Sequence, residues 1–373
     1  MSSSLSTIYN NKIKNKALHF LFKFYTLAFV FCVNIMINIQ ENTSLKPFNT
    51  FGIDVKAKYF AEYSTVAELN TLLQSEIVRQ NPLLHIGGGS NLLFLNDFEG
   101  IILHSKIKTI EIAEENDDSV LLKVGSGVIW DDFVAYCVAN NYYGVENLSL
   151  IPGEAGASAV QNIGAYGVEV KDTIEKVAFI EIKTGESKIF TNQECKYSYR
   201  KSIFKSELKN KVIVTHVYFR LGKKAVFTLN YANLSDTVVK NGEINLKNVR
   251  KTVIEIRGSK LPDPKILGNA GSFFMNPIIL KTQFNELLRS YPTMPHYPVS
   301  ETEVKVPAGW LIEQCGLKGK QFEKVGIYHK QALVIVNLNG ATGEDIATVA
   351  SLVQMTVKKR FGITIFPEVI YIS

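Results

Sequence analysis

The sequence comprises 373 residues, of which 46% are hydrophobic and 20% are charged, a balance typical of a globular protein with two or three domains. Its formal net charge of +6 is concentrated near the N-terminus, because residues 1–35 contain four lysines and no acidic side chain. The rest of the chain is almost neutral, which argues against a nucleic-acid-binding surface.

Four cysteines are spread widely along the chain: Cys32, Cys137, Cys195 and Cys315. No two of them have the spacing of metal ligands, and their pattern is not that of a secreted disulfide framework. We therefore expect no metal site and a reducing, cytoplasmic compartment. Cys137 falls on the apolar face of a predicted helix, so we expect it in the core.

An apolar segment, residues 17–39, follows a polar and basic N-terminus. Its composition and length are those of a signal peptide or a membrane anchor. However, His19, Lys23 and Asn34 interrupt the run, and no small-residue cleavage site follows it. We interpret residues 1–35 as an extension upstream of the native start, with a membrane anchor as the alternative. The globular part is then expected to begin at Met36.

The first elements have clear local signals. A strand is predicted within residues 46–57, where Pro47 precedes alternating apolar and polar side chains. The sequence Ser64-Thr65-x-x-Glu68 ahead of several leucines predicts a helix that starts with a capping box.

A glycine-rich turn at residues 87–91 lies between two short apolar segments, residues 83–86 and 92–95. The order strand, helix, strand, glycine turn and strand is typical of a small α+β nucleotide-binding unit. It is not the dinucleotide fingerprint, because no G-x-G-x-x-G opens a helix here.

Further elements follow from periodicity and capping. Strands are predicted at residues 100–112, 120–124, 177–182, 187–191, 212–221, 333–337 and 363–372. Helices are predicted at residues 130–140, 249–257, 284–291, 308–315 and 343–361.

The most informative stretch is residues 151–172, IPGEAGASAVQNIGAYGVEVKD, whose first seventeen residues include four glycines, four alanines and a single charge, Glu154. Glycine permits a positive φ and lets a ligand approach the backbone closely. Free backbone N–H groups in such a loop suit phosphates and polar ring edges. We therefore predict a loop that contacts a flat, mostly apolar cofactor. A tight packing seam of small residues is the alternative.

Five short signatures occur in a fixed order: Gly-Gly-Gly-Ser-Asn at 87–91, the stretch 151–172, Tyr-Arg-Lys-Ser-Ile-Phe at 199–204, Gly-Asn-Ala-Gly-Ser-Phe-Phe-Met-Asn-Pro at 268–277, and Pro-Glu-Val at 367–369. Together they resemble the family of UDP-N-acetylenolpyruvoylglucosamine reductases (MurB), flavoenzymes of peptidoglycan precursor synthesis. The resemblance covers about residues 42–373, and the order of the signatures makes chance recurrence implausible.

The resemblance implies an α+β protein with a two-subdomain FAD-binding fold of the vanillyl-alcohol-oxidase type and an α+β substrate-binding domain. The corresponding ranges are 36–105 and 106–224 for the two FAD-binding subdomains and 225–373 for the substrate-binding domain. The implied reaction is NADPH-dependent reduction of UDP-N-acetylglucosamine enolpyruvate to UDP-N-acetylmuramate via FAD. The preference for NADPH over NADH rests on the family alone. We expect a cytoplasmic monomer that acts on small molecules and binds neither nucleic acid nor membrane.

The resemblance also implies which residues contact FAD. No histidine or cysteine lies within 87–91 or 151–172 to tether the flavin, so we expect FAD to be non-covalent. We interpret His85, just upstream, as a packed or surface histidine. Many relatives have a neutral residue at the position of Glu154, so the resemblance does not imply a contact between this residue and the flavin. The implied FAD contacts are Asn49, Thr50, Gly87, Gly88, Gly89, Ser90, Asn91, Leu92, Pro152, Gly153, Gly156, Ala157, Gln161, Asn162, Gly164, Ala165, Tyr166 and Gly167.

Three residues match the catalytic positions of the family: Arg200, Ser272 and Glu368. Arg200 can hold the substrate carboxylate bidentately and stabilise enolate-like charge. Ser272 can donate the proton that quenches the carbanion. Glu368 can orient Arg200 or, when protonated, polarise the carboxylate. Without the resemblance, a surface ion pair, a turn serine and a solvated edge glutamate are the simpler interpretations.

Four further residues match substrate positions of the family: Tyr231, Lys260, Asn276 and Gln331. In relatives that carry the tyrosine-bearing insertion, the tyrosine covers the substrate diphosphate and moves when substrate binds. Lys260 is a suitable counter-charge for that diphosphate.

Two other functions are kept as alternatives. One is a flavin oxidase or dehydrogenase of the same superfamily that acts on an alcohol or a sugar. The other is a membrane-tethered protein that binds flavin or a nucleotide sugar without catalysis, anchored by residues 17–39. The signatures at 199–204 and 268–277 favour the reductase over the first alternative.

Overall fold

The computed structural model describes residues 38–231 and 233–373. The predicted extension, residues 1–35, lies outside the described residues, as does nearly all of the apolar segment 17–39. Within the described part of the chain, no helix combines the length and apolarity needed to cross a membrane.

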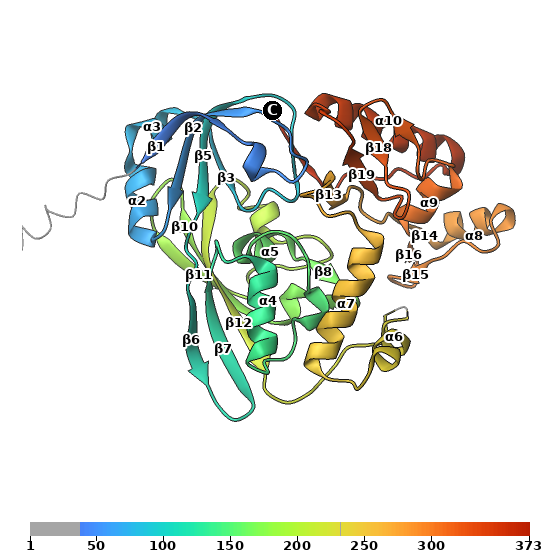
Figure 1. Ribbon diagram of the computed structural model, residues 1–373, viewed down its shortest axis with the longest axis horizontal. Helices are drawn as coiled ribbons and strands as arrows, with labels where there is room; N and C mark the ends of the chain where they lie inside the picture. The colour runs from blue at the N-terminus through green and yellow to red at the C-terminus, as the bar shows by residue number, and fades with distance from the viewer. Residues whose placement is uncertain (1–37, 232) are drawn as a thin grey trace, which may run out of the picture. The chain divides into compact units, whose positions relative to one another are not determined.

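The first sheet has four strands in the order β1-β2-β5-β3 (Figure 1). Its strands are β1 (Ile39–Ser44), β2 (Lys56–Tyr63), β3 (Leu83–Ile86) and β5 (Phe98–Ser105). β1 runs antiparallel to β2, whereas β2 and β3 are both parallel to β5. Helices α2 (Val66–Gln74) and α3 (Glu76–Gln80) connect β2 to β3, as a parallel crossover requires.

The predicted capping box at the start of α2 forms in part, because the Glu68 carboxylate bonds the N–H of Ser64 and not that of the cap residue Thr65. The Glu68 N–H donates to Thr65 Oγ1 at 3.1 Å, and the Glu68 carboxylate accepts from the Ser64 N–H at 2.7 Å. These bonds satisfy donors at the helix N-terminus that have no partner within the helix.

The strand predicted within residues 46–57 is wrong, because this segment is a short 3₁₀ turn, η1 (Lys46–Phe48), followed by a loop up to β2. The Asn49 amide donates to the carbonyls of Leu45 and Ile53 at 2.8 Å each, and its oxygen accepts from the Ile53 N–H at 3.0 Å. One side chain therefore replaces the partners that a neighbouring strand would provide. Phe51 and Val55 are nevertheless buried, so the alternation reflects burial of a loop.

The second sheet is fully antiparallel, with strand order β11-β10-β12-β7-β6. Its strands are β6 (Ile110–Glu115), β7 (Ser119–Gly125), β10 (Ile174–Glu181), β11 (Ser187–Thr191) and β12 (Val212–Gly222). Helices α4 (Trp130–Ala139) and α5 (Ala155–Gln161) contribute to the same core. There the rings of Trp130, Phe133 and Phe219 pack against one another at tilted angles, and Cys137 is fully buried as predicted.

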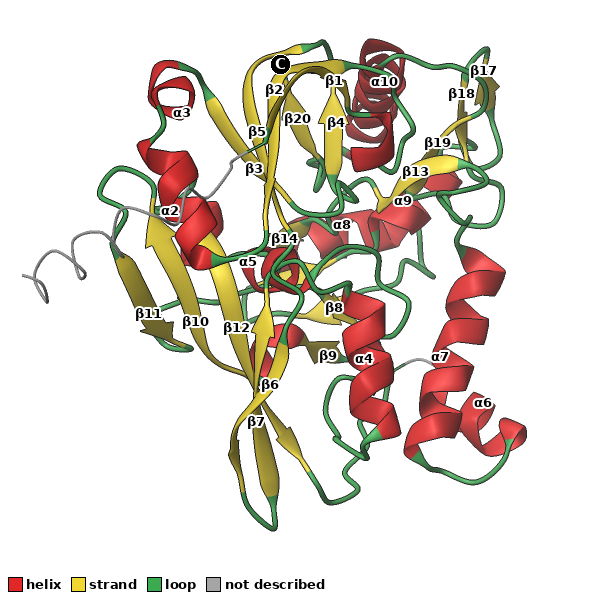
Figure 2. Ribbon diagram, turned by 60° about the vertical axis from the view of Figure 1, so that its left-hand side comes forward, coloured by secondary structure: helices red, strands yellow, loops and turns green. Residues whose placement is uncertain are grey.

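Two helices follow the second sheet, α6 (Leu234–Asn241) and α7 (Leu246–Lys260), and they share a small apolar cluster of their own. α7 lies beside α4 (Figure 2), and the Arg250 guanidinium binds both oxygens of Asp131 on α4, at 2.7 and 2.9 Å. α7 therefore packs on the second sheet's layer of helices, although residues 225–373 were expected to form one substrate-binding domain. The domain boundaries stay a prediction.

The C-terminal part contains a four-stranded antiparallel sheet in the order β13-β19-β18-β17 and a three-stranded one in the order β14-β16-β15. Three helices accompany these sheets (Figure 1): α8 (Lys281–Ser290), α9 (Ala308–Gln314) and α10 (Gly343–Phe361). The strands are β13 (Gly268–Ser272), β14 (Ile278–Leu280), β15 (Tyr297–Pro298), β16 (Glu303–Lys305), β17 (Gln321–Phe322), β18 (Val325–Ile327) and β19 (Val334–Asn337).

The closing strand predicted at residues 363–372 is too long: only β20 (Ile370–Ile372) is a strand, and it pairs in parallel with β4 (Leu92–Phe94). Pro367 has no N–H to donate to a ladder. The segment before β20 instead contacts the end of the signature at 268–277, where the Met275 N–H donates to the Phe366 carbonyl at 2.9 Å. The C-terminus therefore returns to the first sheet's core, which is continuous with that of the C-terminal part.

Candidate active site

The stretch 151–172 is not the loop that its glycines predicted. Ala155–Gln161 form the helix α5, followed by β8 (Gly164–Ala165), β9 (Val168–Glu169) and η3 (Val170–Asp172). Alanine has the highest helix propensity of all residues, which accounts for the helix. The special backbone angles lie at its ends, where Gly153 has φ +119° and Asn162 has φ +46°.

The first backbone N–H groups of α5 are not free for a ligand either. The N–H of Ala155 donates to the Val128 carbonyl at 2.9 Å, and that of Gly156 donates to the Ser126 carbonyl at 3.0 Å. These bonds attach the start of α5 to the segment between β7 and α4. The prediction that this stretch offers a run of free N–H groups is therefore wrong for these two residues.

The two glycine-rich signatures lie against each other. A Cβ on Gly88 would lie 3.4 Å from the Cα of Gly153, and the Ser90 hydroxyl donates to the Pro152 carbonyl at 3.1 Å. Gly89 has φ +64°, and a Cβ there would lie 1.9 Å from the Phe48 carbonyl oxygen. Only glycine fits at this position, so the close approach of the Gly87–Leu92 turn to Phe48 and Asn49 depends on it.

Arg200 lies in a tight turn with φ +56°, a region that non-glycine residues rarely occupy. Its guanidinium donates to the carbonyls of Asn162 at 3.3 Å and Gly164 at 2.9 Å. Its Nε lies 3.1 Å from Oε1 of Glu368. Two carbonyls of the stretch 151–172 therefore orient Arg200 of the segment 199–204. Glu368 of the segment 367–369 supplies the carboxylate that pairs with this arginine.

Glu368 is held next to the fourth signature by backbone contacts. Its N–H donates to the Phe273 carbonyl at 2.8 Å, directly after Ser272 at the end of β13. The Asn91 amide of the first signature donates to the Glu368 carbonyl at 3.1 Å and to Gln161 Oε1 at 2.9 Å. All five signatures therefore meet at Glu368 and its neighbours.

Arg200, Ser272 and Glu368 together line a pocket of about 160 Å³, the first pocket. A second pocket of about 390 Å³ lies between the Gly87–Leu92 turn and α5 and is also lined by Lys205 and Lys209. The two pockets share five lining residues: Ser90, Asn91, Glu154, Ala157 and Gln161. They are therefore adjacent, and a long ligand with two dissimilar ends could occupy both.

Many of the residues predicted to contact FAD line one or both pockets: Gly87, Gly88, Gly89, Ser90, Asn91, Leu92, Pro152, Gly153, Gly156, Ala157, Gln161 and Gly164. The others, which do not line them, are Asn49, Thr50, Asn162, Ala165, Tyr166 and Gly167. Asn49 and Asn162 shape the backbone instead, as described above.

The residues present fit a flavin nucleotide. The glycine turns make a cradle that side chains would fill, and the two adjacent pockets suit the two ends of such a molecule. Within the described residues, five buried polar atoms make no hydrogen bond of good geometry: Thr50 Oγ1, Asn70 Oδ1, Asn147 Oδ1, Tyr197 Oη and Arg200 Nε. Of these five residues, Arg200 lines the first pocket, where its guanidinium suits a polar or anionic ligand.

None of the four predicted substrate residues lines the first or the second pocket. The ring of Tyr231 is half exposed and contacts the edge of Tyr166, with centroids 6.2 Å apart. Lys260 is the exposed last residue of α7. Asn276 Oδ1 accepts from the Ala308 N–H at 2.9 Å, and Gln331 Oε1 accepts from the Leu333 N–H at 3.4 Å. In the described part of the chain, no hydrogen bond joins these four side chains to one another.

The first pocket is also lined by three residues outside all five signatures, which the sequence analysis missed: Arg257, Trp130 and Leu261. Arg257 on α7 donates from Nε to the Leu150 carbonyl at 3.3 Å, and burial together with the charge of Arg200 lowers its pKa. The pocket therefore contains two guanidinium groups, which favours an anionic ligand. Arg257 lies three residues before the predicted Lys260, but nothing in its local pattern distinguishes it from a surface arginine.

Tyr199 connects Arg200 to the C-terminal part of the chain. The Lys305 ammonium on β16 lies 4.5 Å from the centre of its ring, and the guanidinium carbon of Arg200 lies 5.9 Å from it. Burial raises the pKa of Tyr199, so its hydroxyl is neutral and can donate a hydrogen bond. Burial also lowers the pKa of Lys205, whose ammonium donates to the Arg200 carbonyl at 3.1 Å.

His85, interpreted as a packed or surface histidine, packs against Tyr63 and also lines the second pocket. Its Nε2 lies 2.8 Å from the Tyr63 hydroxyl, and burial lowers its pKa to about 3, so the ring is neutral. Among the described residues, no group of three or more His, Cys, Asp or Glu side chains is placed to hold a metal ion.

Two family models match the chain. Residues 263–372 match the C-terminal domain of UDP-N-acetylenolpyruvoylglucosamine reductase, and residues 57–190 match an FAD binding domain. The UDP-N-acetylenolpyruvoylglucosamine reductase of Bacteroides fragilis (strain YCH46) is 52% identical over 334 residues, which is 90% of this chain and 100% of the relative. That of Porphyromonas gingivalis (strain W83) is 50% identical over 337 residues, 90% of this chain and 99% of the relative.

One solved structure has a similar fold over most of the chain. The crystal structure of UDP-N-acetylenolpyruvylglucosamine reductase (MurB) from Thermus caldophilus aligns with a TM-score of 0.65 and 21% identity. The alignment covers 91% of this chain and 100% of that one. At this identity the similarity supports the fold alone.

Proposed function

This chain belongs to the UDP-N-acetylenolpyruvoylglucosamine reductase (MurB) family, and we propose that Arg200, Ser272 and Glu368 carry out its reaction. It is an FAD-dependent oxidoreductase with the α+β fold of vanillyl-alcohol-oxidase-type flavoproteins. It reduces UDP-N-acetylglucosamine enolpyruvate to UDP-N-acetylmuramate with NADPH, a step of peptidoglycan synthesis. The observation that carries the site assignment is the meeting of all five signatures at Glu368.

FAD would be held between the two glycine-rich signatures by the lining residues of the two pockets. The chemistry that FAD supplies when bound is hydride transfer, from NADPH in the first half-reaction and to the enolpyruvyl double bond in the second. The glycines at 88 and 153 let the two glycine-rich segments that line the pockets lie close together, which larger residues would prevent.

Arg200 binds the substrate carboxylate in this proposal. When a hydride reaches the terminal vinyl carbon, negative charge develops on the carbon beside the carboxylate and spreads into it. A guanidinium can form two parallel hydrogen bonds to a carboxylate and stabilise that charge. The carbonyls of Asn162 and Gly164 fix the orientation of Arg200 before substrate arrives, so little reorganisation is needed.

Glu368 positions Arg200 from the opposite side, because its carboxylate lies 3.1 Å from Nε. Side-chain exposures of 20% for Arg200 and 15% for Glu368 mean that water screens this pair only weakly. The pair therefore keeps the guanidinium turned into the first pocket.

Ser272 donates the proton in this proposal. It lines the first pocket at the end of β13, with its backbone paired to β19, and its neighbour Phe273 is fixed to Glu368. A hydroxyl can transfer a proton to the developing carbanion, and the nearby guanidinium groups of Arg200 and Arg257 would stabilise the oxygen that remains.

Four residues at the edge of this site would bind the nucleotide part of the substrate: Tyr231, Lys260, Asn276 and Gln331. Lys260 is exposed at the surface, and its ammonium group on a flexible side chain suits a diphosphate. Tyr231 lies next to Gly167 and Tyr166, where its ring could cover a bound diphosphate.

The reaction is proposed to take place in the cytoplasm on a monomer, with residues 36–105 and 106–224 as FAD-binding subdomains and 225–373 as substrate-binding domain. The thiols of Cys137, Cys195 and Cys315 are free, which agrees with a reducing compartment. Gel filtration with light scattering would test the monomer.

The proposed function is tested by the visible spectrum of the purified protein. We expect a flavin spectrum that is bleached by NADPH without oxygen and restored by the enolpyruvyl substrate. Acid or heat should release the flavin. Flavin that is reduced by an alcohol or a sugar and reoxidised only by oxygen would favour an oxidase instead. A protein that binds flavin or nucleotide sugar without turnover would favour the binding-protein alternative.

A further inference from the structure

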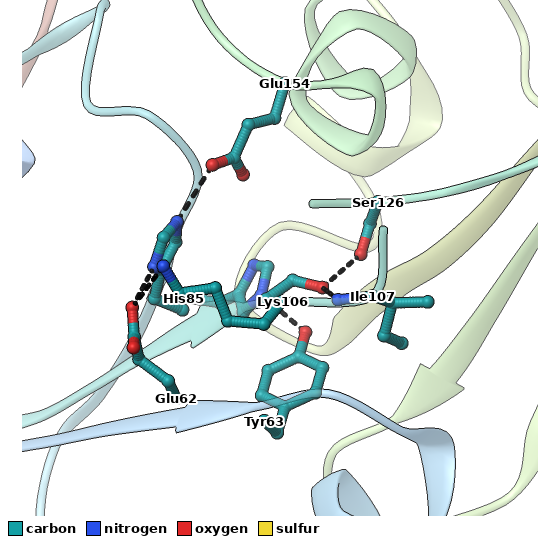
Figure 3. A network of polar contacts seen from close by, with 9 residues as sticks. Glu62, Tyr63, His85, Lys106, Ile107, Ser126 and Glu154 are labelled. Carbon is teal, nitrogen blue, oxygen red and sulfur yellow. Dashed lines mark hydrogen bonds and ion pairs between the residues drawn. The ribbon is translucent and has the colours of Figure 1, made fainter. Parts of the chain in front are cut away.

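A chain of charged side chains crosses from the first sheet to the start of α5 (Figure 3). The Lys106 ammonium lies 3.0 Å from Glu62 Oε1. The same oxygen lies 2.9 Å from Nδ1 of His104, and Nε2 of His104 lies 2.9 Å from Glu154 Oε1. His104 belongs to β5 and Glu62 to β2, whereas Glu154 is the residue that precedes α5.

Both ring nitrogens of His104 face a carboxylate oxygen. A neutral imidazole has only one N–H, so it can donate to one carboxylate and must turn a lone pair towards the other. The imidazolium donates to both. His104 and Glu154 are only 6% and 8% exposed, so water cannot replace the bond between them. The geometry therefore favours the charged ring.

Four titratable groups face His104 from the elements around it. Glu62 and Glu154 are described above, Lys106 follows β5 and binds Glu62, and His85 on β3 is neutral. Burial alone would lower the pKa of His104, but the hydrogen bonds and charges of Glu154 and Glu62 raise it above its ordinary value. The ring therefore keeps its proton to a higher pH than an ordinary histidine and loses it as the pH rises through that raised value.

Glu154 lies where the two pockets join, because it lines both. A Cβ on Gly87 would lie 3.2 Å from Glu154 Oε2 and 3.3 Å from the Cβ of Ala157. The first turn of α5 is thus in direct contact with the Gly87–Leu92 turn through this carboxylate. A shift of Glu154 would change the separation of the two glycine-rich segments.

The charge of Glu154 also matters for a nucleotide ligand. An unpaired carboxylate in this position would repel the phosphates of a dinucleotide, whereas a carboxylate bonded to an imidazolium is neutralised locally. Loss of the proton from His104 would therefore both loosen the start of α5 and expose the ligand to a negative charge.

We propose that His104 is a positioning residue of the flavin site, whose imidazolium ties Glu154 at the start of α5 to Glu62 of the first sheet and so controls how tightly FAD is retained. This inference rests on the proposed function, because it requires that FAD occupies the two pockets. It predicts that FAD retention decreases as the pH rises through the raised pKa of His104.

The test measures FAD release from the holoprotein as a function of pH, from the rise in flavin fluorescence after dilution. The informative variant is Glu62→Gln, because Glu62 lies outside both pockets and is 36% exposed. It removes one of the two charges that raise the pKa of His104. We expect the midpoint of FAD release to move to lower pH by about one unit or more, since a neighbouring opposite charge shifts a pKa by roughly 1–3 units.

The matched control is Glu175→Gln. Glu175 is equally exposed, at 35%, and pairs with Arg220 at 2.7 Å on the second sheet. Its removal should leave the pH profile unchanged. The variant His104→Gln should release FAD faster at neutral pH, by about tenfold, with no dependence on pH across the midpoint of the wild type.

Imidazole nitrogen NMR of the holoprotein gives the second readout, with His104→Gln to assign the signal among six histidines. The pKa of His104 should fall in Glu62→Gln together with the midpoint of FAD release. A fall of that pKa without a shift of the midpoint would overturn the inference while leaving the proposed function intact. A wild-type protein that contains no flavin would instead refute the proposed function.

Discussion

The Arg200 Nε atom lies 3.1 Å from Oε1 of Glu368, although one residue follows the central stretch and the other lies near the C-terminus. Arg200 reaches this position only by adopting φ +56°. Strained backbone of this kind costs on the order of 1–3 kcal/mol and persists where the surroundings enforce it, as two backbone carbonyls do here.

The first prediction concerns this arginine. Arg200→Ala should weaken substrate binding and slow flavin reoxidation by about 100-fold or more, because the charge contacts the carboxylate both before and during the reaction. Flavin reduction by NADPH should persist. Arg200→Lys should recover part of the loss, since it restores the charge without the planar fork. Stopped-flow absorbance over a range of substrate concentrations separates binding from rate.

A control for this prediction is Arg220→Ala. Arg220 also binds carboxylates, Glu114 and Glu175, but lines neither pocket. Its removal should leave both half-reactions unchanged. Equal losses in the Arg200 and Arg220 variants would mean that the effect arises from general destabilisation.

Elements with a local signal were predictable from the sequence. Thr65 and Thr342 cap α2 and α10 through their side chains, and the reciprocal bond of a full capping box forms at α10. The strands predicted at 177–182 and 187–191 both form, as parts of β10 and β11, and they pair antiparallel. In these cases the hydrogen bonds that define the element join residues close in the chain.

Elements that depend on distant partners were not predictable. The loop after η1 has the alternation of a strand, but Asn49 bonds its backbone locally. Glu368 is placed by Asn91 and Phe273, which are far from it in the sequence. Nothing near His104 indicates that its ring lies between Glu62 and Glu154. The family signatures in the sequence identify the candidate site residues. The contacts between these residues become visible only in the folded structure.

The second prediction concerns the glycines of the cradle. Gly153→Val should abolish FAD binding, because Gly153 has φ +119° and a Cβ would lie 3.1 Å from Ser90 Oγ. Gly164→Val should do the same, since a Cβ there would lie 3.0 Å from the Val168 carbonyl oxygen. The ratio of flavin to protein absorbance measures the loss.

The glycine control is Gly258→Ala on α7. A Cβ on Gly258 meets nothing within 4 Å. The substitution should keep full flavin and raise the free energy of unfolding by about 0.5–1 kcal/mol, because alanine is the better helix former. Full flavin content in Gly164→Val would refute the assignment of the central stretch.

The third prediction concerns the pair formed by Asp131 and Arg250. Burial opposes ionisation of Asp131, but the hydrogen bonds from Arg250 and from the Leu150 N–H lower its pKa. Because the pKa of Asp131 is lower in the folded state than in the unfolded state, where it is about 3.9, its ionised carboxylate stabilises the fold at any pH above the unfolded-state pKa. This contribution is lost as the pH falls through the folded-state pKa. Asp131→Asn should therefore lower the free energy of unfolding at neutral pH, by about 1–3 kcal/mol, and have little effect in strong acid.

Urea denaturation at neutral and acidic pH measures that difference. The comparison variant is Glu111→Gln, which removes an ion pair with Lys123 at the surface. Such exposed pairs contribute about 1 kcal/mol or less. An effect of Asp131→Asn that is as large in acid as at neutral pH would show that shape rather than charge is lost.

The fourth prediction concerns the N-terminal extension. A protein that begins at Met36 should bind FAD and turn over like the full chain, because all five signatures lie downstream. The Bacteroides fragilis relative is matched over its whole length by 90% of this chain. Flavin content and turnover of both forms, with membrane fractionation of the full chain, decide the matter. Loss of activity on truncation, or membrane association of the full chain alone, would favour the anchor interpretation.

The fifth prediction concerns Ser272 and separates the two half-reactions. Reduction of flavin by NADPH requires no proton on carbon, so Ser272→Ala should still bleach the flavin at a near-normal rate. Reoxidation by the enolpyruvyl substrate requires a proton on the carbon beside the carboxylate. A general acid typically accelerates a reaction about 10²–10⁴-fold. Because water in the pocket is a poor proton donor, the rate of flavin reoxidation should fall by about 100-fold or more.

The comparison of Ser272→Ala with Ser272→Cys tests the proton rather than the shape. Ser272 ends β13, and its backbone pairs with Val334, so neither substitution needs to disturb the strand. A thiol can donate a proton and should recover part of the reoxidation rate, whereas alanine cannot. Stopped-flow absorbance with each substrate measures both halves separately. If alanine slows both halves equally, the serine shapes the pocket; if it slows neither, the proton comes from another group and the assigned role is wrong.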